Sequence, residues 1–267
     1  MLRAESLVEQ ALAVEESRAD ELIKLEQSLT DRLFKDDSAD AKKGRRLMAL
    51  RAGYGEFMCT LLFLTPIFGA VGNYSLFTNI SGSTIVMIAA FVSGFQAVAV
   101  AFTFSSVSGA HFNPAISWAL WLTGKLSNRK VFLYVCVQMM ASVLAMAIIG
   151  AIFGTNRNEI YDACAVVPTN GDRLGEVFAT EFFLTFFLTY IAFTVVFEDS
   201  ERSKKETMSF KTISDSRGLT LYASTPQSKT GFAPFAIGFT IFSLNLIGGE
   251  SGGAFNPARM FGPAVFR

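Results

Sequence analysis

The sequence predicts an all-α membrane protein whose two halves repeat with inverted topology. Of the 267 residues, 51% are hydrophobic, and the charged residues are concentrated near the N-terminus: positions 1–46 hold 20 of the 46. The triplet Asn-Pro-Ala occurs twice, each time at the start of an apolar segment too short to cross a bilayer. Paired interrupted segments in two halves of a chain are typical of a solute site in a membrane protein.

Five full spans are predicted from apolar runs of about 20 residues each. They cover 52–72, 83–104, 131–154, 177–197 and 230–249, and Glu56 and Glu181 are the charged residues inside them. Two half-length segments, 113–124 and 256–267, begin at the repeated triplets. Asn is a favoured N-cap and Pro suits the first helical position, so each triplet (Asn113, Pro114, Ala115 and Asn256, Pro257, Ala258) predicts the start of a half-helix.

The distribution of Lys and Arg predicts the orientation. Basic residues crowd the segment before the first span and the connection at 198–229, whereas the loop after 154 carries only Arg157 and Arg173. We therefore expect a cytosolic N-terminus. The protein itself is expected in the plasma membrane or in an internal vesicle or vacuole membrane. Asn73 and Asn79 then lie outside, in sequons that make them candidate glycosylation sites, although such short motifs also occur by chance.

Residues 1–50 form a separate cytosolic arm in this interpretation. Residues 1–40 contain no Gly or Pro, and leucines at helical spacing predict an amphipathic helix from about Glu5 to Phe34. Acidic residues outnumber basic ones there, so strong binding to anionic lipid is not favoured.

Enzyme chemistry has little support in the sequence. Cys59, Cys136 and Cys164 show neither metal-ligand spacing nor a disulfide framework, and His111 is the only histidine. We expect no catalytic residues, no metal, no cofactor and no nucleic-acid partner.

The segments Ser-Gly-Ala-His-Phe-Asn-Pro-Ala and Ser-Gly-Gly-Ala-Phe-Asn-Pro-Ala-Arg resemble the signature of the major intrinsic proteins, the aquaporin family. The resemblance covers about residues 50–267 and implies a channel domain at 51–267, a homotetramer in the bilayer, and passive conduction of water. The family fold has six full spans, the last after the second half-helix, so we expect that the sequence, which stops at Arg267, is cut short.

The same resemblance implies roles for individual residues. The Asn113 and Asn256 amides would orient water at the pore centre and oppose proton passage. Arg259 matches the arginine of the outer constriction, with Ser93, Gly253 and either Leu244 or Asn245 beside it. Glu56 and Glu181 match the glutamates that accept hydrogen bonds from the re-entrant loops. For Glu56, a charge facing water near a helix end is the alternative.

The expected filter matches neither the usual water-selective set nor the usual glycerol set, and its residues are smaller. We therefore predict passage of water and small uncharged solutes such as urea or glycerol, without mercurial block at position 253. Alternatives are a glycerol or urea facilitator, a coupled secondary transporter, and a non-conducting scaffold.

The connection at 198–229 is longer than most loops, and in this family the same loop serves as a gate in some members. Tyr222, Phe210 and Leu221 are the plug candidates, and Ser203, Thr207 and Ser209 the candidate phosphorylation sites. A linker without a role is the alternative.

Overall fold

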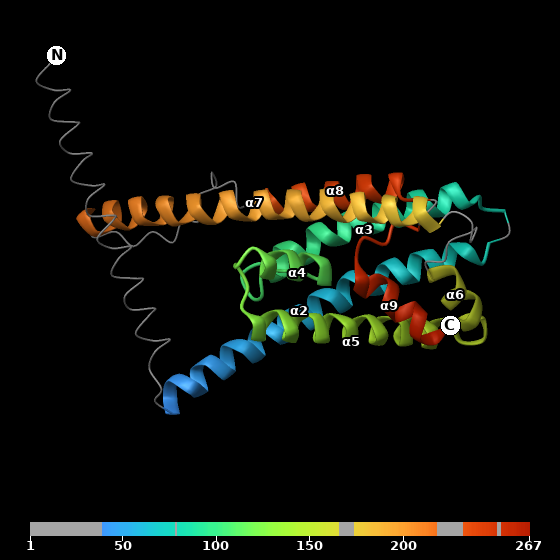
Figure 1. Cartoon of the computed structure of the whole chain (residues 1–267), viewed down its shortest axis with the longest axis horizontal. Helices are drawn as coiled ribbons and strands as arrows, with labels where there is room; N and C mark the ends of the chain where they lie inside the picture. Colours follow the sequence, from blue (N-terminus) through green and yellow to red (C-terminus); the bar gives the residue numbers. More distant parts are fainter. Residues whose placement is uncertain (1–38, 78, 166–173, 218–231, 250–251) are drawn as a thin grey trace, which may run out of the picture. The chain divides into compact units, whose positions relative to one another are not determined.

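The computed structural model describes residues 39–77, 79–165, 174–217, 232–249 and 252–267 (Figure 1). Tyr222, Leu221 and the expected N-terminal helix lie outside these residues. Phe210, Ser203, Thr207 and Ser209 are described only as backbone within a helix.

Every regular element among the described residues is helical, as predicted. They are α2 (Ala39–Ser75), α3 (Gly82–Phe104), α4 (Pro114–Leu122), α5 (Asn128–Phe153), a 3₁₀ turn η1 (Gly154–Asn156), α6 (Arg157–Cys164), α7 (Leu174–Arg217), α8 (Ala233–Ile247) and α9 (Pro257–Phe266). Four stretches of the described residues are long and apolar enough to span a membrane: Lys42–Ser75, Gly82–Phe104, Asn128–Cys164 and Leu174–Val195.

Three helices differ from the predicted bounds. α2 begins at Ala39, 13 residues before the predicted start at residue 52, in a charged stretch that hydropathy does not detect. α8 has 15 residues, fewer than the span predicted at 230–249, because Pro234 lies in its first turn and the helix stops at Gly248. α7 continues to Arg217, well past residue 197 where a loop was expected. Residues 198–217 contain neither Gly nor Pro, so nothing in this polar stretch interrupts a helix.

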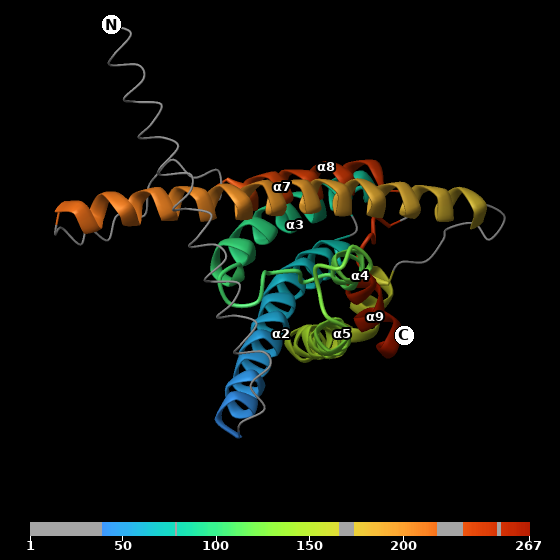
Figure 2. The same ribbon diagram turned by 60° about the vertical axis from the view of Figure 1, so that its left-hand side comes forward.

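The contacts divide the chain into two compact units, and the site lies in the one made of Leu50–Ser203 and Ala223–Arg267. Within this unit α3 packs along α8, and the two lie side by side in Figures 1 and 2. The two helices approach closely at Gly94 and Gly238, because a Cβ atom on Gly238 would lie 2.6 Å from the Gly94 carbonyl oxygen. Such small residues let two membrane helices meet backbone to backbone.

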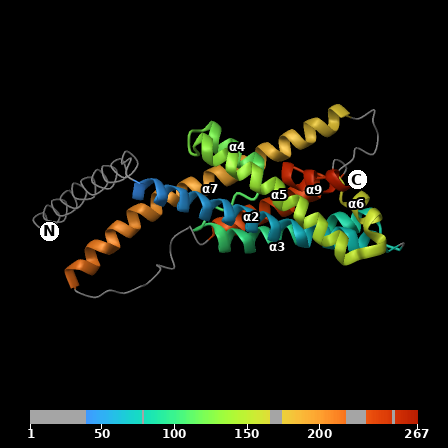
Figure 3. The same cartoon turned by 90° about the horizontal axis from the view of Figure 1, so that it is seen from below.

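α9 packs against α5, as Figure 3 shows from below, and α4 also contacts α5. α5 therefore supports both short helices, which begin at the two Asn-Pro-Ala triplets.

Candidate functional site

The two half-helices begin at asparagines that cap them. Asn113 Oδ1 accepts a hydrogen bond from the Ala115 N–H at 2.9 Å, and Asn256 Oδ1 accepts one from the Ala258 N–H at 3.0 Å. Pro114 and Pro257 occupy the first helical turn, where a missing N–H costs nothing. The predicted starts of both half-helices are therefore where the structure places them.

Each asparagine also reaches across to the other motif. Asn113 Nδ2 donates to the Phe255 carbonyl oxygen at 3.0 Å, and Asn256 Nδ2 donates to the Phe112 carbonyl oxygen at 3.0 Å. Both asparagines are buried. The reciprocal pair joins the N-termini of α4 and α9 at one point, although the motifs lie far apart in the sequence.

The turns that lead into the motifs are conformationally unusual. Ala110, Phe112 and Phe255 all have positive φ, at 50°, 37° and 25°. Residues with a Cβ atom seldom adopt this region, and such conformations persist only where surrounding contacts hold them. Phe112 and Phe255 are also the residues whose carbonyl oxygens accept hydrogen bonds from the asparagines.

Glu56 holds the first of these turns. Its Oε1 accepts from Ser108 Oγ at 2.7 Å and from the His111 N–H at 2.9 Å. Its Oε2 accepts from the Phe112 N–H at 2.9 Å and from Gln138 Nε2 at 2.8 Å. The side chain is completely buried, which rules out the alternative of a carboxylate facing water. Four donors instead compensate for the lost hydration of the charge.

Glu181 occupies the corresponding place at the second motif. Its two carboxylate oxygens accept from the Ala254 N–H at 3.0 Å and from the Phe255 N–H at 2.8 Å. Unlike Glu56, Glu181 is only partly buried. The structure thus brings both glutamates to the re-entrant turns.

A row of polar side chains on α5 supports the half-helices and was not singled out in the sequence. Tyr134 Oη donates to the Ser108 carbonyl oxygen at 2.5 Å. One turn later Gln138 Nε2 also donates to Ser117 Oγ at 3.1 Å, and one turn beyond it Ser142 contacts α9. The spacing of four residues between polar groups in an apolar helix is the signal that would have found them.

His111 lies in the same network. Its Nδ1 is 3.0 Å from Ser117 Oγ, and its ring packs edge-on against Tyr134.

Of the expected filter residues, the structure brings Asn245 and Gly253 together. Gly253 has φ of +53°, and a Cβ atom placed on it would lie 3.3 Å from Asn245 Oδ1. Asn245 Nδ2 donates to the Ile241 carbonyl oxygen at 2.8 Å within α8, and its neighbour Leu244 is also buried. Asn245, more clearly than Leu244, therefore adjoins the second motif.

Arg259 lies in the first turn of α9, and its Nη1 is buried with no hydrogen-bond partner among the described residues. Ser93 is buried on α3. Within the described part of the chain these two side chains do not hydrogen-bond to each other. Asn73 and Asn79 are exposed.

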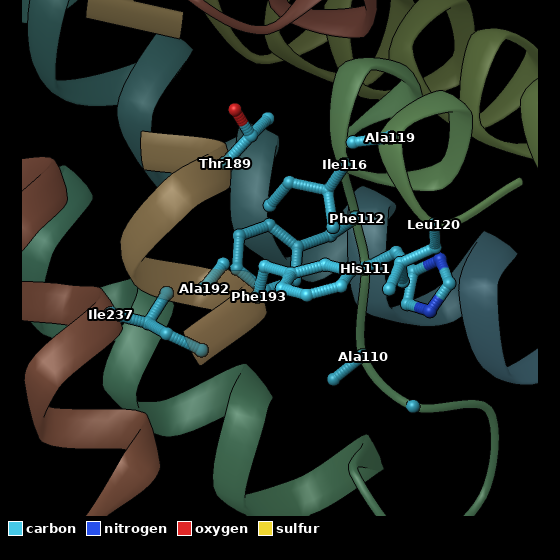
Figure 4. Close-up of a pocket in the computed structure, with 11 residues that line it drawn as sticks. Ala110, His111, Phe112, Ile116, Ala119, Leu120, Thr189, Ala192, Phe193 and Ile237 are labelled. Atoms are coloured by element: carbon cyan, nitrogen blue, oxygen red, sulfur yellow. The ribbon is translucent and has the colours of Figure 1, made fainter. Parts of the chain in front are cut away.

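A cavity of about 80 Å³ adjoins the first motif (Figure 4). Its walls come from the turn at 109–112 and from side chains of α4, α7 and α8, among them Leu120, Phe193 and Ile237. The Thr189 hydroxyl donates to carbonyl oxygens of its own helix at 2.8 and 3.0 Å, so it offers the cavity little polarity. This small cavity has mostly apolar walls.

Comparison with known proteins adds independent information. Residues 43–214 and 217–267 match the family model described as Major intrinsic protein. Aquaporin-B of Dictyostelium discoideum is 40% identical over 233 residues, which cover 86% of this chain and 78% of the relative. An aquaporin of Encephalitozoon hellem is 32% identical over 233 residues, covering 83% of this chain and 85% of that protein.

Among solved structures, the aquaglyceroporin from Plasmodium falciparum has the same fold, with a TM-score of 0.60. The match covers 82% of this chain and 81% of that one at 19% sequence identity.

Proposed function

This chain is a membrane channel of the major intrinsic protein family, and we propose that it conducts water and small uncharged solutes while excluding protons and ions. The observation that carries the proposal is the reciprocal hydrogen bonding of Asn113 and Asn256 to the opposite turns. Each amide nitrogen carries two hydrogens, and the hydrogen bond to the opposite turn uses one. The second hydrogen of each amide is then available to a water oxygen at the meeting point of the half-helices.

Exclusion of protons and cations follows from the same arrangement. The N-termini of α4 and α9 meet at the asparagines, and each contributes a partial positive charge. A water molecule that accepts from both amides must point its hydrogens away along the pore, so it cannot pass a proton between them. Both effects oppose cations and protons at the centre of the pore.

The proposed filter consists of Arg259, Ser93, Gly253 and Asn245, with Leu244 beside it. Small side chains next to a single arginine leave room for solutes larger than water, such as urea or glycerol. Both reported relatives are named aquaporins, which supports water as a solute, whereas the aquaglyceroporin structure, at 19% identity, supports the fold alone.

We assign Glu56 and Glu181 to bracing the re-entrant turns. All four donors around Glu56 come from the first turn or from α5, and none is a solute-facing cation. A coupled transporter needs titratable groups that change partners during transport. The saturated hydrogen bonding of Glu56 favours a passive channel over that alternative.

Regulation by residues 198–229 is part of the proposal. Tyr222, Phe210 and Leu221 are proposed to close the cytosolic mouth, and phosphate on Ser203, Thr207 or Ser209 to change the position of this segment. The proposal includes a cytosolic N-terminus, a homotetramer, and glycan acceptors at the exposed Asn73 and Asn79.

The first experiment reconstitutes the full chain in liposomes and records stopped-flow shrinkage under osmotic shock. A variant lacking residues 204–222 is measured beside it. Fast water flux with a low activation energy from the full chain indicates an open channel whose 198–229 segment does not close it. Flux from the deletion variant alone indicates a pore closed by that segment. If neither folded and inserted protein conducts water, the proposed function is wrong.

A further inference from the structure

Ser142 of α5 inserts its hydroxyl group into the backbone of α9. Ser142 Oγ accepts a hydrogen bond from the Gly262 N–H at 3.0 Å and donates one to the Ala258 carbonyl oxygen. In an uninterrupted α-helix these two backbone groups, four residues apart, bond to each other. The hydroxyl therefore bridges a pair that the helix would otherwise satisfy internally, and a side chain inserted in this way is a recognised cause of a helix bend.

The sequence of α9 is suited to this insertion. Pro263 lies inside the helix, where it has no N–H to offer the Arg259 carbonyl group and its ring crowds that carbonyl. Gly262 precedes it, and a Cβ atom on Gly262 would collide with the hydroxyl and carbonyl oxygens of Ser142. A helix loosened by proline and without a side chain at the contact leaves space for a hydroxyl from the neighbouring helix.

The first half-helix is held differently. α4 contains neither Gly nor an interior Pro, and α5 reaches it through a side chain, from Gln138 Nε2 to Ser117 Oγ at 3.1 Å. Gln138 and Ser142 are one turn apart on the same buried face of α5. α5 thus bonds to a side chain of α4 but to backbone groups of α9.

We propose that Ser142 is a positioning residue that sets the course of the α9 backbone and thereby the place of the Arg259 side chain. Arg259 follows directly after Ala258, whose carbonyl group Ser142 holds, and its Nη1 is buried without a partner among the described residues. No hydrogen bond of that nitrogen within the described chain fixes its position, so in this proposal the course of α9 sets it. The inference rests on the proposed role of Arg259 in the filter.

The test measures Arg259 directly. Full-length protein in liposomes is treated with phenylglyoxal, a small neutral reagent for arginine. The rate of modification is followed at Arg259 by tandem mass spectrometry of fragment 257–267, which separates Arg259 from the exposed Arg267. Ser142→Ala is expected to raise the rate about fivefold, the factor corresponding to one hydrogen bond of about 1 kcal/mol. The ratio of urea to water permeability is expected to rise with it.

Two variants separate positioning from general damage. Thr60→Val removes another buried hydroxyl, one without a partner among the described residues, and is expected to change the rate by less than about twofold. Pro263→Ala restores the N–H that can pair with Arg259, so Ser142→Ala should have a much smaller effect in that background. Such non-additivity is expected only if Ser142 acts through the backbone of α9.

Equal rates for Ser142→Ala and Thr60→Val would overturn the inference, as would additive effects of Ser142→Ala and Pro263→Ala. An unchanged urea-to-water ratio in a conducting Ser142→Ala channel would overturn it too. If Ser142→Ala does not fold, Ser142→Cys keeps the size and a weak donor, and an intermediate rate is then expected. If the wild type conducts nothing, the proposed function fails, while the Arg259 rates still decide about Ser142.

Discussion

Replacing Glu56 by Gln is the most direct test of how the first re-entrant turn is held. The change keeps the shape of the side chain but exchanges one acceptor oxygen for an NH₂ donor. Glu56 Oε1 and Oε2 each accept two hydrogen bonds, and each oxygen faces one backbone N–H, that of His111 or Phe112. Whichever way the new amide is oriented, one backbone N–H loses its acceptor.

The remaining donors can adapt. The Ser108 hydroxyl can rotate to accept, and Gln138 can turn its amide so that its unpartnered Oε1 accepts from residue 56. Two contributions then lower the free energy of unfolding. One buried N–H is left unsatisfied, which costs about 1–3 kcal/mol. The hydrogen bonds to the remaining oxygen are weaker because their acceptor no longer carries a charge. We expect a total of about 2–4 kcal/mol in the free energy of unfolding, or a Tm lower by about 4–16 °C.

The assay is thermal unfolding of the purified protein in detergent, followed by intrinsic fluorescence. Glu159→Gln is the matched control, because Glu159 is exposed on α6 and the same change there should alter stability by less than about 0.5 kcal/mol. Glu181→Gln should fall between the two, since Glu181 is only partly buried. A Glu56→Gln protein as stable as Glu159→Gln would refute the reasoning that the four hydrogen bonds are needed.

Three further predictions concern the pore and the packing. Gly253→Cys should make water flux sensitive to mercurials, and a thiol reagent should restore the flux. Wild-type flux should not be blocked at this position. If the folded variant is insensitive, residue 253 lies away from the pore. Gly238→Ala puts a Cβ atom 2.6 Å from the Gly94 carbonyl oxygen, and should cost about 1–3 kcal/mol of stability, measured by thermal unfolding. Phe193→Ala enlarges the cavity beside the first motif, so urea and glycerol permeability should rise. The rise should be several-fold larger than for Phe187→Ala, a change at an exposed residue of the same helix. Equal effects of the two variants would contradict a place for Phe193 on the solute path.

The parts of the fold that follow from local chemistry could be predicted from the sequence. Asn followed by Pro at the head of an apolar segment favours a helix start, so the beginnings of α4 and α9 were predictable to the residue. The far end of α7 was not, because hydropathy reports where apolar residues stop and a polar stretch without Gly or Pro can continue as helix. The length of α8 is limited by Pro234 and Gly248, and the mean hydropathy of an apolar run does not detect such helix-ending residues.

Some residues of the site were likewise predictable from the sequence and others were not. Glu56 and Glu181 stand out because a carboxylate within an apolar span is rare. Gln138 and Ser142 are uncharged and do not stand out in this way, and the partner that Ser142 holds, Ala258, is 116 positions away. The sequence left Leu244 and Asn245 as alternatives, because which of them lies beside Gly253 depends on how that turn approaches α8.

The exchange of hydrogen bonds between the two motifs has a consequence for how the protein is made. The two bonds join residues 142 and 144 positions apart, so neither can form until nearly all of these residues have left the ribosome. Until then the Phe112 carbonyl group and the Asn113 amide must find temporary partners, in water or in the insertion machinery, because hydrocarbon offers none. Contacts of such sequence separation delay folding. Maturation of the first half therefore has to wait for synthesis of the second.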